Sequence, residues 1–168
     1  MLTAMNAEAT NHANDRDATL PRRRWLNHTP PSWVRDGTYF ITLCCRERGR
    51  NELCQPETAG SLLETIRHYH EQRRWHVHLW LLMPDHAHAL ITCPSRENFA
   101  KVMTAWKRYT ALHCSLEWQK GFFDHRLRSN ESFEEKAAYI LMNPVRKGLV
   151  TNPDDWPHVW MPDGRDAG

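Results

Sequence analysis

The sequence lacks a long hydrophobic run, a paired-cysteine pattern and a strong net charge, and each absence removes a class of protein. No stretch approaches the roughly 18 consecutive apolar residues of a transmembrane helix. Polar side chains interrupt the first residues, so the apolar centre of a secretory signal is missing. We therefore expect a cytoplasmic protein that has no membrane partner.

The cysteines form no metal-binding or disulfide pattern. The chain has five, an odd number, and no two of them are separated by two residues. Free thiols in a reducing compartment fit better than a disulfide framework or a zinc knuckle. The five positions are Cys44, Cys45, Cys54, Cys93 and Cys114.

The net charge is only +2, so the chain as a whole is not a polycation that would by itself indicate nucleic acid. Basic residues are nevertheless grouped near the ends of predicted elements. These groups matter for DNA only if the fold brings them to one site. The candidate DNA-binding residues are Arg22, Arg23, Arg24, Lys107, Arg108, Arg126, Arg128, Arg146 and Lys147.

Length and composition indicate one globular domain. A chain of 168 residues can bury a core without crosslinks, and 40% hydrophobic with 25% charged residues is an ordinary globular profile. Residues 1–21 are predicted to be a disordered polar leader and residues 161–168 a flexible tail. The folded domain is therefore expected at residues 22–160.

The first half of this domain is predicted to be a strand, a helix and a hairpin. Residues 38–44 are rich in β-branched and aromatic side chains, and residues 58–74 carry apolar side chains at helical spacing. The apolar run at 75–83 is typical of a central strand covered on one or both faces. A Pro-Asp turn separates it from a further strand at 86–92.

The second half begins with a helix that Ser95 is expected to cap and that runs to about Cys114. Residues 122–128 are predicted as a short strand or an extended connection. Ser132 and Glu135 have the form of a capping box, which opens a helix at residues 133–142. The element order fits an α+β fold with an antiparallel sheet and helices packed on one face.

A His-Ala-His triplet begins the strand after the Pro-Asp turn. Because side chains alternate along a strand, His86 and His88 project to the same side, about 6–7 Å apart, and can hold one divalent ion. The chain has two similar pairs. His68 and His70 diverge on a helix, and the pair at 76 and 78 lies far from the turn, so we interpret both as exposed or hydrogen-bonded histidines.

Tyr139 and Asn143 lie four residues apart at the end of the last predicted helix and share a face. Each has an ordinary explanation, because tyrosine often packs and asparagine before proline often ends a helix. Together with two imidazoles, however, they suit phosphodiester cleavage. A phenol, with an ordinary pKa near 10, needs assistance as a nucleophile, and an amide oxygen suits Mg²⁺ or Mn²⁺. Such an ion would polarise the scissile phosphate.

Several motifs resemble one family. MPDHAHALI resembles the HUH signature of single-tyrosine transposases of the IS200/IS605 type. WQKGFFDHRLR, YILMNPVRKGLV and DWP resemble the REP-associated tyrosine transposases, and TYFITLCC followed by RGRNELC is similar to the opening of one subgroup. The resemblance covers residues 22–160. The motifs lie at residues 83–91, 118–128, 139–150, 155–157, 38–45 and 48–54.

The resemblance implies a ferredoxin-like fold and assigns roles residue by residue. His86 and His88 match the histidine ligands, Tyr139 matches the nucleophile and Asn143 matches the position that completes the metal site. The implied activity is nicking and rejoining of single-stranded DNA at imperfect palindromes (REP hairpins), with Arg22, Arg23 and Arg24 as a basic arm beside the guide sequence. A monomer is favoured, although a dimer stays open.

Two other functions stay open at this point. A catalytically idle protein could keep the fold and only bind REP hairpins. A hydrolytic metallonuclease could use water as the nucleophile, with Tyr139 in a structural role. A covalent protein–DNA adduct separates the transesterification mechanism from both.

Overall fold

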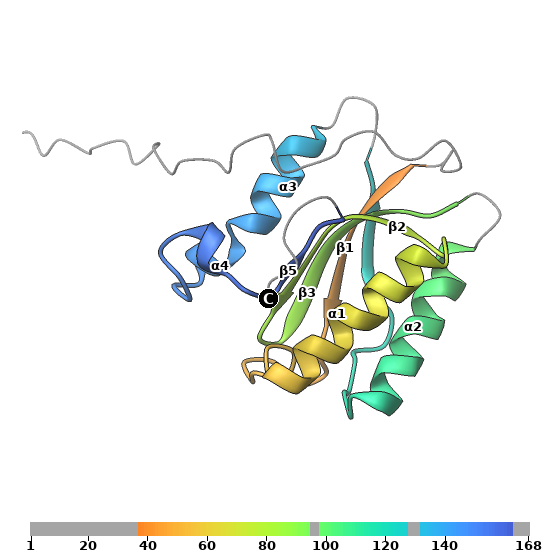
Figure 1. The fold of residues 1–168 in the computed structure, drawn as a ribbon, viewed down its shortest axis with the longest axis horizontal. Coiled ribbons are helices and arrows are strands. Elements are labelled where there is room, and N and C mark those ends of the chain that lie inside the picture. Colours follow the sequence, from red (N-terminus) through yellow and green to blue (C-terminus); the bar gives the residue numbers. More distant parts are fainter. Residues whose placement is uncertain (1–36, 95–97, 128–131, 163–168) are drawn as a thin grey trace, which may run out of the picture.

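The computed structural model describes residues 37–94, 98–127 and 132–162. Its centre is a five-stranded antiparallel sheet with the strand order β4-β1-β3-β2-β5 (Figure 1). The strands are β1 Thr38–Cys44, β2 His76–Met83, β3 His86–Thr92, β4 Phe123–Arg126 and β5 Val159–Trp160. The helices are α1 Pro56–Glu71, α2 Phe99–His113, α3 Phe133–Leu141 and the single turn α4 Asn143–Arg146, followed by a 3₁₀ turn at Pro153–Asp155.

The first four strands have a ferredoxin-like topology. β1 and β2 both pair antiparallel with β3, which lies between them, so they run parallel and are joined by the crossover helix α1. β4 pairs with the outer side of β1, and α2 connects β3 to it. The antiparallel α+β fold expected from the sequence is therefore confirmed, with β5 added at the free edge of β2.

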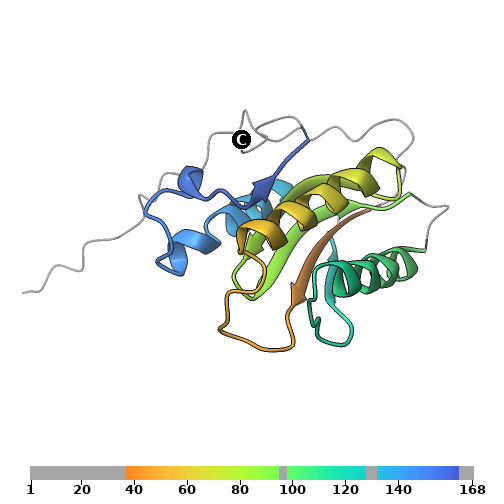
Figure 2. The same ribbon diagram turned by 60° about the horizontal axis from the view of Figure 1, so that its bottom comes forward.

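The helices do not all pack on one face of the sheet, which corrects the expectation from the sequence. α1 and α2 cover one face and α3 covers the other (Figures 1 and 2). The reason lies in β2 and β3, in which every residue is buried, so that both faces are apolar and both need a cover. Ile41 and Leu43 of β1 point towards α1 and α2, and Phe40 points towards α3.

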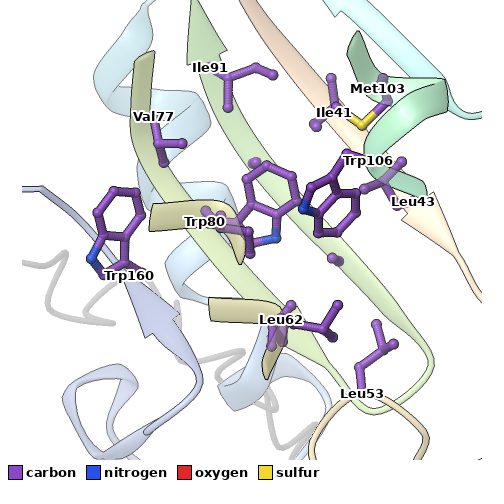
Figure 3. Packing of buried hydrophobic residues seen from close by; sticks show 14 of the residues in the cluster. Ile41, Leu43, Leu53, Leu62, Val77, Trp80, Ile91, Met103, Trp106 and Trp160 are labelled. Atoms are coloured by element: carbon purple, nitrogen blue, oxygen red, sulfur yellow. The ribbon is translucent and has the colours of Figure 1, made fainter. Parts of the chain in front are cut away.

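Large aromatic rings fill the core beneath α1 and α2 (Figure 3). Trp80 of β2 and Trp106 of α2 are fully buried, with ring centroids 5.1 Å apart. The indole N–H of Trp106 donates to Thr65 Oγ1 on α1 at 3.1 Å, so its polar atom is satisfied inside the core. This packing fixes the sheet on which the candidate site is built.

The helix caps agree with the sequence in one case and differ in another. Ser132 caps α3 as expected, since its Oγ accepts from the backbone N–H of Glu135 at 3.2 Å. α2 is capped by Asn98, whose side-chain oxygen accepts from the N–H of Lys101. The expected cap Ser95 lies outside the described residues. In the part of the chain that the structure describes, no helix is long and apolar enough to cross a bilayer.

The second histidine pair, His76 and His78, is buried and not exposed. The register of β2 against β3 shifts between Val77 and Leu79. The His78 ring lies against Phe133 of α3, with ring centroids 5.1 Å apart. His78 Nε2 lies 2.8 Å from Thr92 Oγ1. Of the two states expected for this pair, exposed or hydrogen-bonded, the second is therefore confirmed for His78.

Candidate active site

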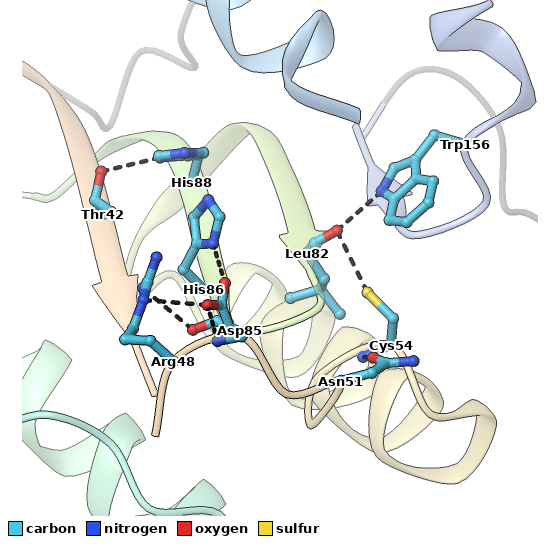
Figure 4. Close-up of polar contacts among 10 residues, drawn as sticks. Thr42, Arg48, Asn51, Cys54, Leu82, Asp85, His86, His88 and Trp156 are labelled. Atoms are coloured by element: carbon cyan, nitrogen blue, oxygen red, sulfur yellow. Dashed lines mark hydrogen bonds and ion pairs between the residues drawn. The ribbon is translucent and has the colours of Figure 1, made fainter. Parts of the chain in front are cut away.

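The two histidines that follow the Pro-Asp turn lie side by side on the face of β3 that α3 covers (Figure 4). The ring centroids of His86 and His88 are 4.9 Å apart. Ala87, between them, belongs to the opposite core under α1 and α2. The strand alternation thus places the two imidazoles on one side of the strand, as the spacing predicted.

Asp85 holds the ring of His86. Its Oδ1 lies 2.6 Å from His86 Nδ1, while its Oδ2 accepts from the Gly49 backbone N–H at 2.7 Å and pairs with Arg48 Nε at 3.1 Å. Burial acts to raise the pKa of Asp85, but the bonds from Gly49 and His86 and the charge of Arg48 together hold that pKa below its ordinary value. The ionised carboxylate accepts a hydrogen bond from the Nδ1–H of His86, which leaves Nε2 as the atom that would bind a metal.

His88 is held from the neighbouring strand. Its Nδ1 lies 2.9 Å from the Oγ1 of Thr42, its cross-strand partner on β1, and its ring stacks on Phe40 with centroids 5.7 Å apart. Burial, followed by the charges of His86 and Arg146, lowers the pKa of His88 to about 3. The ring is therefore neutral at pH 7, the form in which imidazole binds a metal.

Tyr139 lies on α3 above this pair and is half exposed, at 47%. Its ring is 6.4 Å from the His88 ring and 6.2 Å from the Phe40 ring, in edge contacts. The guanidinium carbon of Arg146 lies 4.2 Å from the Tyr139 ring centroid, and Arg146 also donates to the Tyr139 carbonyl oxygen. The phenol ring is thus positioned by a cation–π contact on one side and by an edge contact with Phe40, with about half of the side chain open to solvent.

Asn143 begins α4 and is buried, at 8% exposed. Its Nδ2 donates to the carbonyl oxygens of Tyr139 at 3.0 Å and Ile140 at 3.2 Å. Only the amide nitrogen can donate, so these bonds fix the orientation of the side chain and leave Oδ1 as the free acceptor. That oxygen is the atom that a hard divalent ion would accept as a ligand.

The chemistry of the two imidazoles and the Asn143 amide oxygen fits a divalent ion that takes further oxygen ligands from its substrate. Within the described ranges, no three His, Cys, Asp or Glu side chains form a cluster that could hold a metal. Two imidazoles, an amide oxygen and the oxygens of a phosphate would complete a site for Mg²⁺ or Mn²⁺. His86, His88 and Asn143 are therefore the candidate protein ligands.

The basic candidates that the structure describes do not all lie on one face of the sheet. Arg146 and Lys147 are exposed next to the His–Tyr cluster, and their charges lower the pKa of His88 and His86 respectively, after burial. Lys107 lies on α2, over the opposite face, and its ammonium donates to the carbonyl oxygens of Gln119 and Gly121.

The remaining basic candidates lie elsewhere. Arg108 is exposed on α2. Arg126 is exposed on β4 and pairs in register with Tyr39, which packs against the core under α1 and α2, so Arg126 also belongs to the opposite face. Arg22, Arg23, Arg24 and Arg128 lie outside the described residues.

Sequence reasoning did not identify the residues that orient the two imidazoles. Asp85 was interpreted only as part of a turn, although its position directly before His86 is a signal that could have been used. Thr42 and Arg48 carry no such signal, because their contacts depend on the pairing of β1 with β3 and on the loop after β1. The C-terminal DWP segment is tied to the same end of the sheet, since the Trp156 indole donates to the Leu82 carbonyl at 2.9 Å (Figure 4).

Comparison with known proteins gives a consistent result. The family model described as "Transposase IS200 like" matches residues 34–140. A REP-associated tyrosine transposase from Escherichia coli (strain K12) is 28% identical over 128 residues, which are 74% of this chain and 76% of the relative. A solved structure of a REP-associated tyrosine transposase bound to a REP hairpin superimposes with a TM-score of 0.66 at 26% identity, covering 80% of this chain and 82% of the other.

Proposed function

Because the chain belongs to the IS200-like transposase family, whose members process DNA, we propose that it is a metal-dependent single-stranded DNA endonuclease and strand transferase. In this proposal it nicks and rejoins DNA at REP-type hairpins with Tyr139 as the nucleophile. The observation that supports it most is the position of the half-exposed Tyr139 ring beside the oriented pair His86 and His88.

The proposed reaction is a transesterification. The Tyr139 oxygen attacks the scissile phosphorus and its proton leaves to solvent. The bond to the 3′ oxygen of the preceding nucleotide breaks, and that oxygen takes up a proton from solvent. The products are a 5′-phosphotyrosine and a free 3′-hydroxyl. Attack by a 3′-hydroxyl on the phosphotyrosine reverses the step, so rejoining needs no ATP because the phosphoester is conserved. Arg146, over the Tyr139 ring, is placed to pair with a phosphate oxygen.

The metal supplies charge neutralisation at the phosphate when it is bound. His86, His88 and Asn143 would hold it, and Asp85 and Thr42 orient the two imidazoles. A neutral His88 suits this role. Mg²⁺ or Mn²⁺ is the expected ion, because the third protein donor is an oxygen.

The DNA partner is inferred from the relative that was solved with a REP hairpin. Arg146 and Lys147 lie at the site and are proposed to contact backbone phosphates there. We also propose DNA contacts by four residues outside the described ranges: Arg22, Arg23, Arg24 and Arg128. Three others would contact DNA only if the strand also crosses the face of the sheet that α2 covers: Lys107, Arg108 and Arg126. We expect the protein to act as a monomer.

The test is incubation with a single-stranded hairpin oligonucleotide labelled at its 3′ end and Mn²⁺, followed by a denaturing gel. A labelled band that migrates with the protein, absent with EDTA and absent in Tyr139→Phe, supports the proposal. Cleavage without such a band would indicate hydrolysis by water. Hairpin binding without cleavage would indicate a catalytically idle DNA-binding protein.

A further inference from the structure

Phe123 is an exposed aromatic residue on the edge strand β4, with 58% of its surface accessible. β4 pairs only with β1 among the described strands, so one edge of β4 has no partner strand in that part of the chain. A single exposed phenylalanine indicates no ligand by itself. Its contacts indicate which ligand.

The register of β4 places Phe123 on the catalytic face. Phe123 pairs with Thr42, whose hydroxyl holds His88, and paired residues of an antiparallel ladder share a face. The Phe123 ring makes an edge contact with Phe40 at a centroid distance of 6.2 Å. Phe40 in turn contacts Tyr139 at 6.2 Å and stacks on His88 at 5.7 Å. A continuous set of rings therefore runs from the metal-ligand candidates through Phe40 to an exposed ring at the rim.

We propose that Phe123 stacks on a nucleobase of the DNA strand next to the scissile phosphate. This inference rests on the proposed function, because it requires single-stranded DNA at Tyr139. Every base presents a flat π surface, and a single aromatic side chain that stacks on a base accounts for about five-fold to more than 100-fold of single-strand affinity. The Phe123 ring contacts Phe40, which in turn contacts the Tyr139 ring. A base stacked on Phe123 would therefore hold the DNA strand beside the bond that breaks.

The experiment uses photocrosslinking in the Tyr139→Phe background, in which DNA should bind without being cut. A single-stranded hairpin oligonucleotide carries 5-iodouracil at each nucleotide flanking the cleavage position in turn, since this base crosslinks on irradiation to an aromatic side chain stacked on it. We expect one position to crosslink to Phe123, identified by mass spectrometry of the peptide. Phe123→Ala should remove that crosslink and weaken binding at least five-fold.

Two further substitutions separate stacking from an apolar contact. Phe123→Trp should retain binding, and Phe123→Leu should not. Tyr109→Ala is the matched control, because Tyr109 is also an exposed aromatic, at 43%, but lies on α2 over the opposite face, and it should leave affinity unchanged.

Two results would overturn the inference while leaving the proposed function intact. One is hairpin binding without any crosslink to Phe123. The other is an affinity that Phe123→Ala leaves unchanged or that Phe123→Leu fully restores. Failure of the parent protein to bind the hairpin at all would instead refute the proposed function.

Discussion

Replacing Asp85 by asparagine tests whether the carboxylate beside His86 prepares that ring for a metal. The substitution keeps the size of the side chain and one acceptor oxygen, which can accept from the Gly49 N–H or from His86 Nδ1 but not from both. It removes the negative charge that fixes the Nδ1 proton of His86 and pairs with Arg48. The ring then loses basicity at Nε2 and loses one restraint on its orientation.

The expected loss is about 10-fold to 100-fold in affinity for Mn²⁺, which corresponds to about 1.4–2.7 kcal/mol. The lower end applies if the asparagine oxygen accepts from His86, and the upper end if it accepts from the Gly49 N–H. The ion pair with Arg48 contributes little of this effect, since the Arg48 side chain is 46% exposed and pairs of this kind are worth about 0–1 kcal/mol.

Isothermal titration with Mn²⁺ measures the affinity, and thermal unfolding checks that the fold survives. Arg48→Gln is the control that removes only the ion pair, and it should change the affinity less than about five-fold. Thr42→Val tests the partner of His88 in the same way, because it removes the hydroxyl at nearly constant volume. An Asp85→Asn protein that binds Mn²⁺ as tightly as the parent would refute the role given to Asp85.

Three further predictions follow from the site. Tyr139→Phe should abolish nicking and leave hairpin binding within about two-fold in a gel-shift assay, since only the exposed hydroxyl is lost; nicking above a few per cent of the parent rate would contradict this. His86→Ala should remove Mn²⁺ binding with the fold retained. His78→Ala should lower the free energy of unfolding by roughly 2–4 kcal/mol because it empties a buried site, and the folded protein should still bind Mn²⁺. Loss of Mn²⁺ binding in His78→Ala and not in His86→Ala would exchange the two assignments. Lys147→Ala should lower the slope of log affinity for the hairpin against log salt concentration by about one unit. Lys107→Ala should lower this slope less, because its ammonium already donates to two carbonyls. Equal slopes for the two variants would mean that the DNA runs elsewhere.

The parts of the fold that depend on local patterns could be predicted from the sequence. The apolar run of β2, the Pro-Asp turn and the alternation of His86 with His88 each depend on neighbours within a few residues. The cap of α3 at Ser132 is likewise a local signal. These local signals predict that the two imidazoles lie on one side of the strand, and this pair is the centre of the candidate site.

The features that depend on tertiary pairing could not be predicted. α3 packs on the opposite face of the sheet from α1 and α2. The periodicity of β2 and β3 does not show which helix covers which face. The contact between Thr42 and His88 depends on the register of β1 with β3. The burial of His78 depends on α3, whose Phe133 ring lies 5.1 Å from the His78 ring.

The measurement that tests the central proposal most directly is mass spectrometry of the protein–DNA adduct. After reaction with a single-stranded hairpin and Mn²⁺, the protein is digested with protease and nuclease, and the peptide that carries the nucleotide phosphate is sequenced. The account predicts that the phosphate is attached to Tyr139, the half-exposed phenol beside His88. Attachment to Tyr109, the exposed tyrosine on α2, or cleavage with no phosphotyrosine peptide, would contradict it.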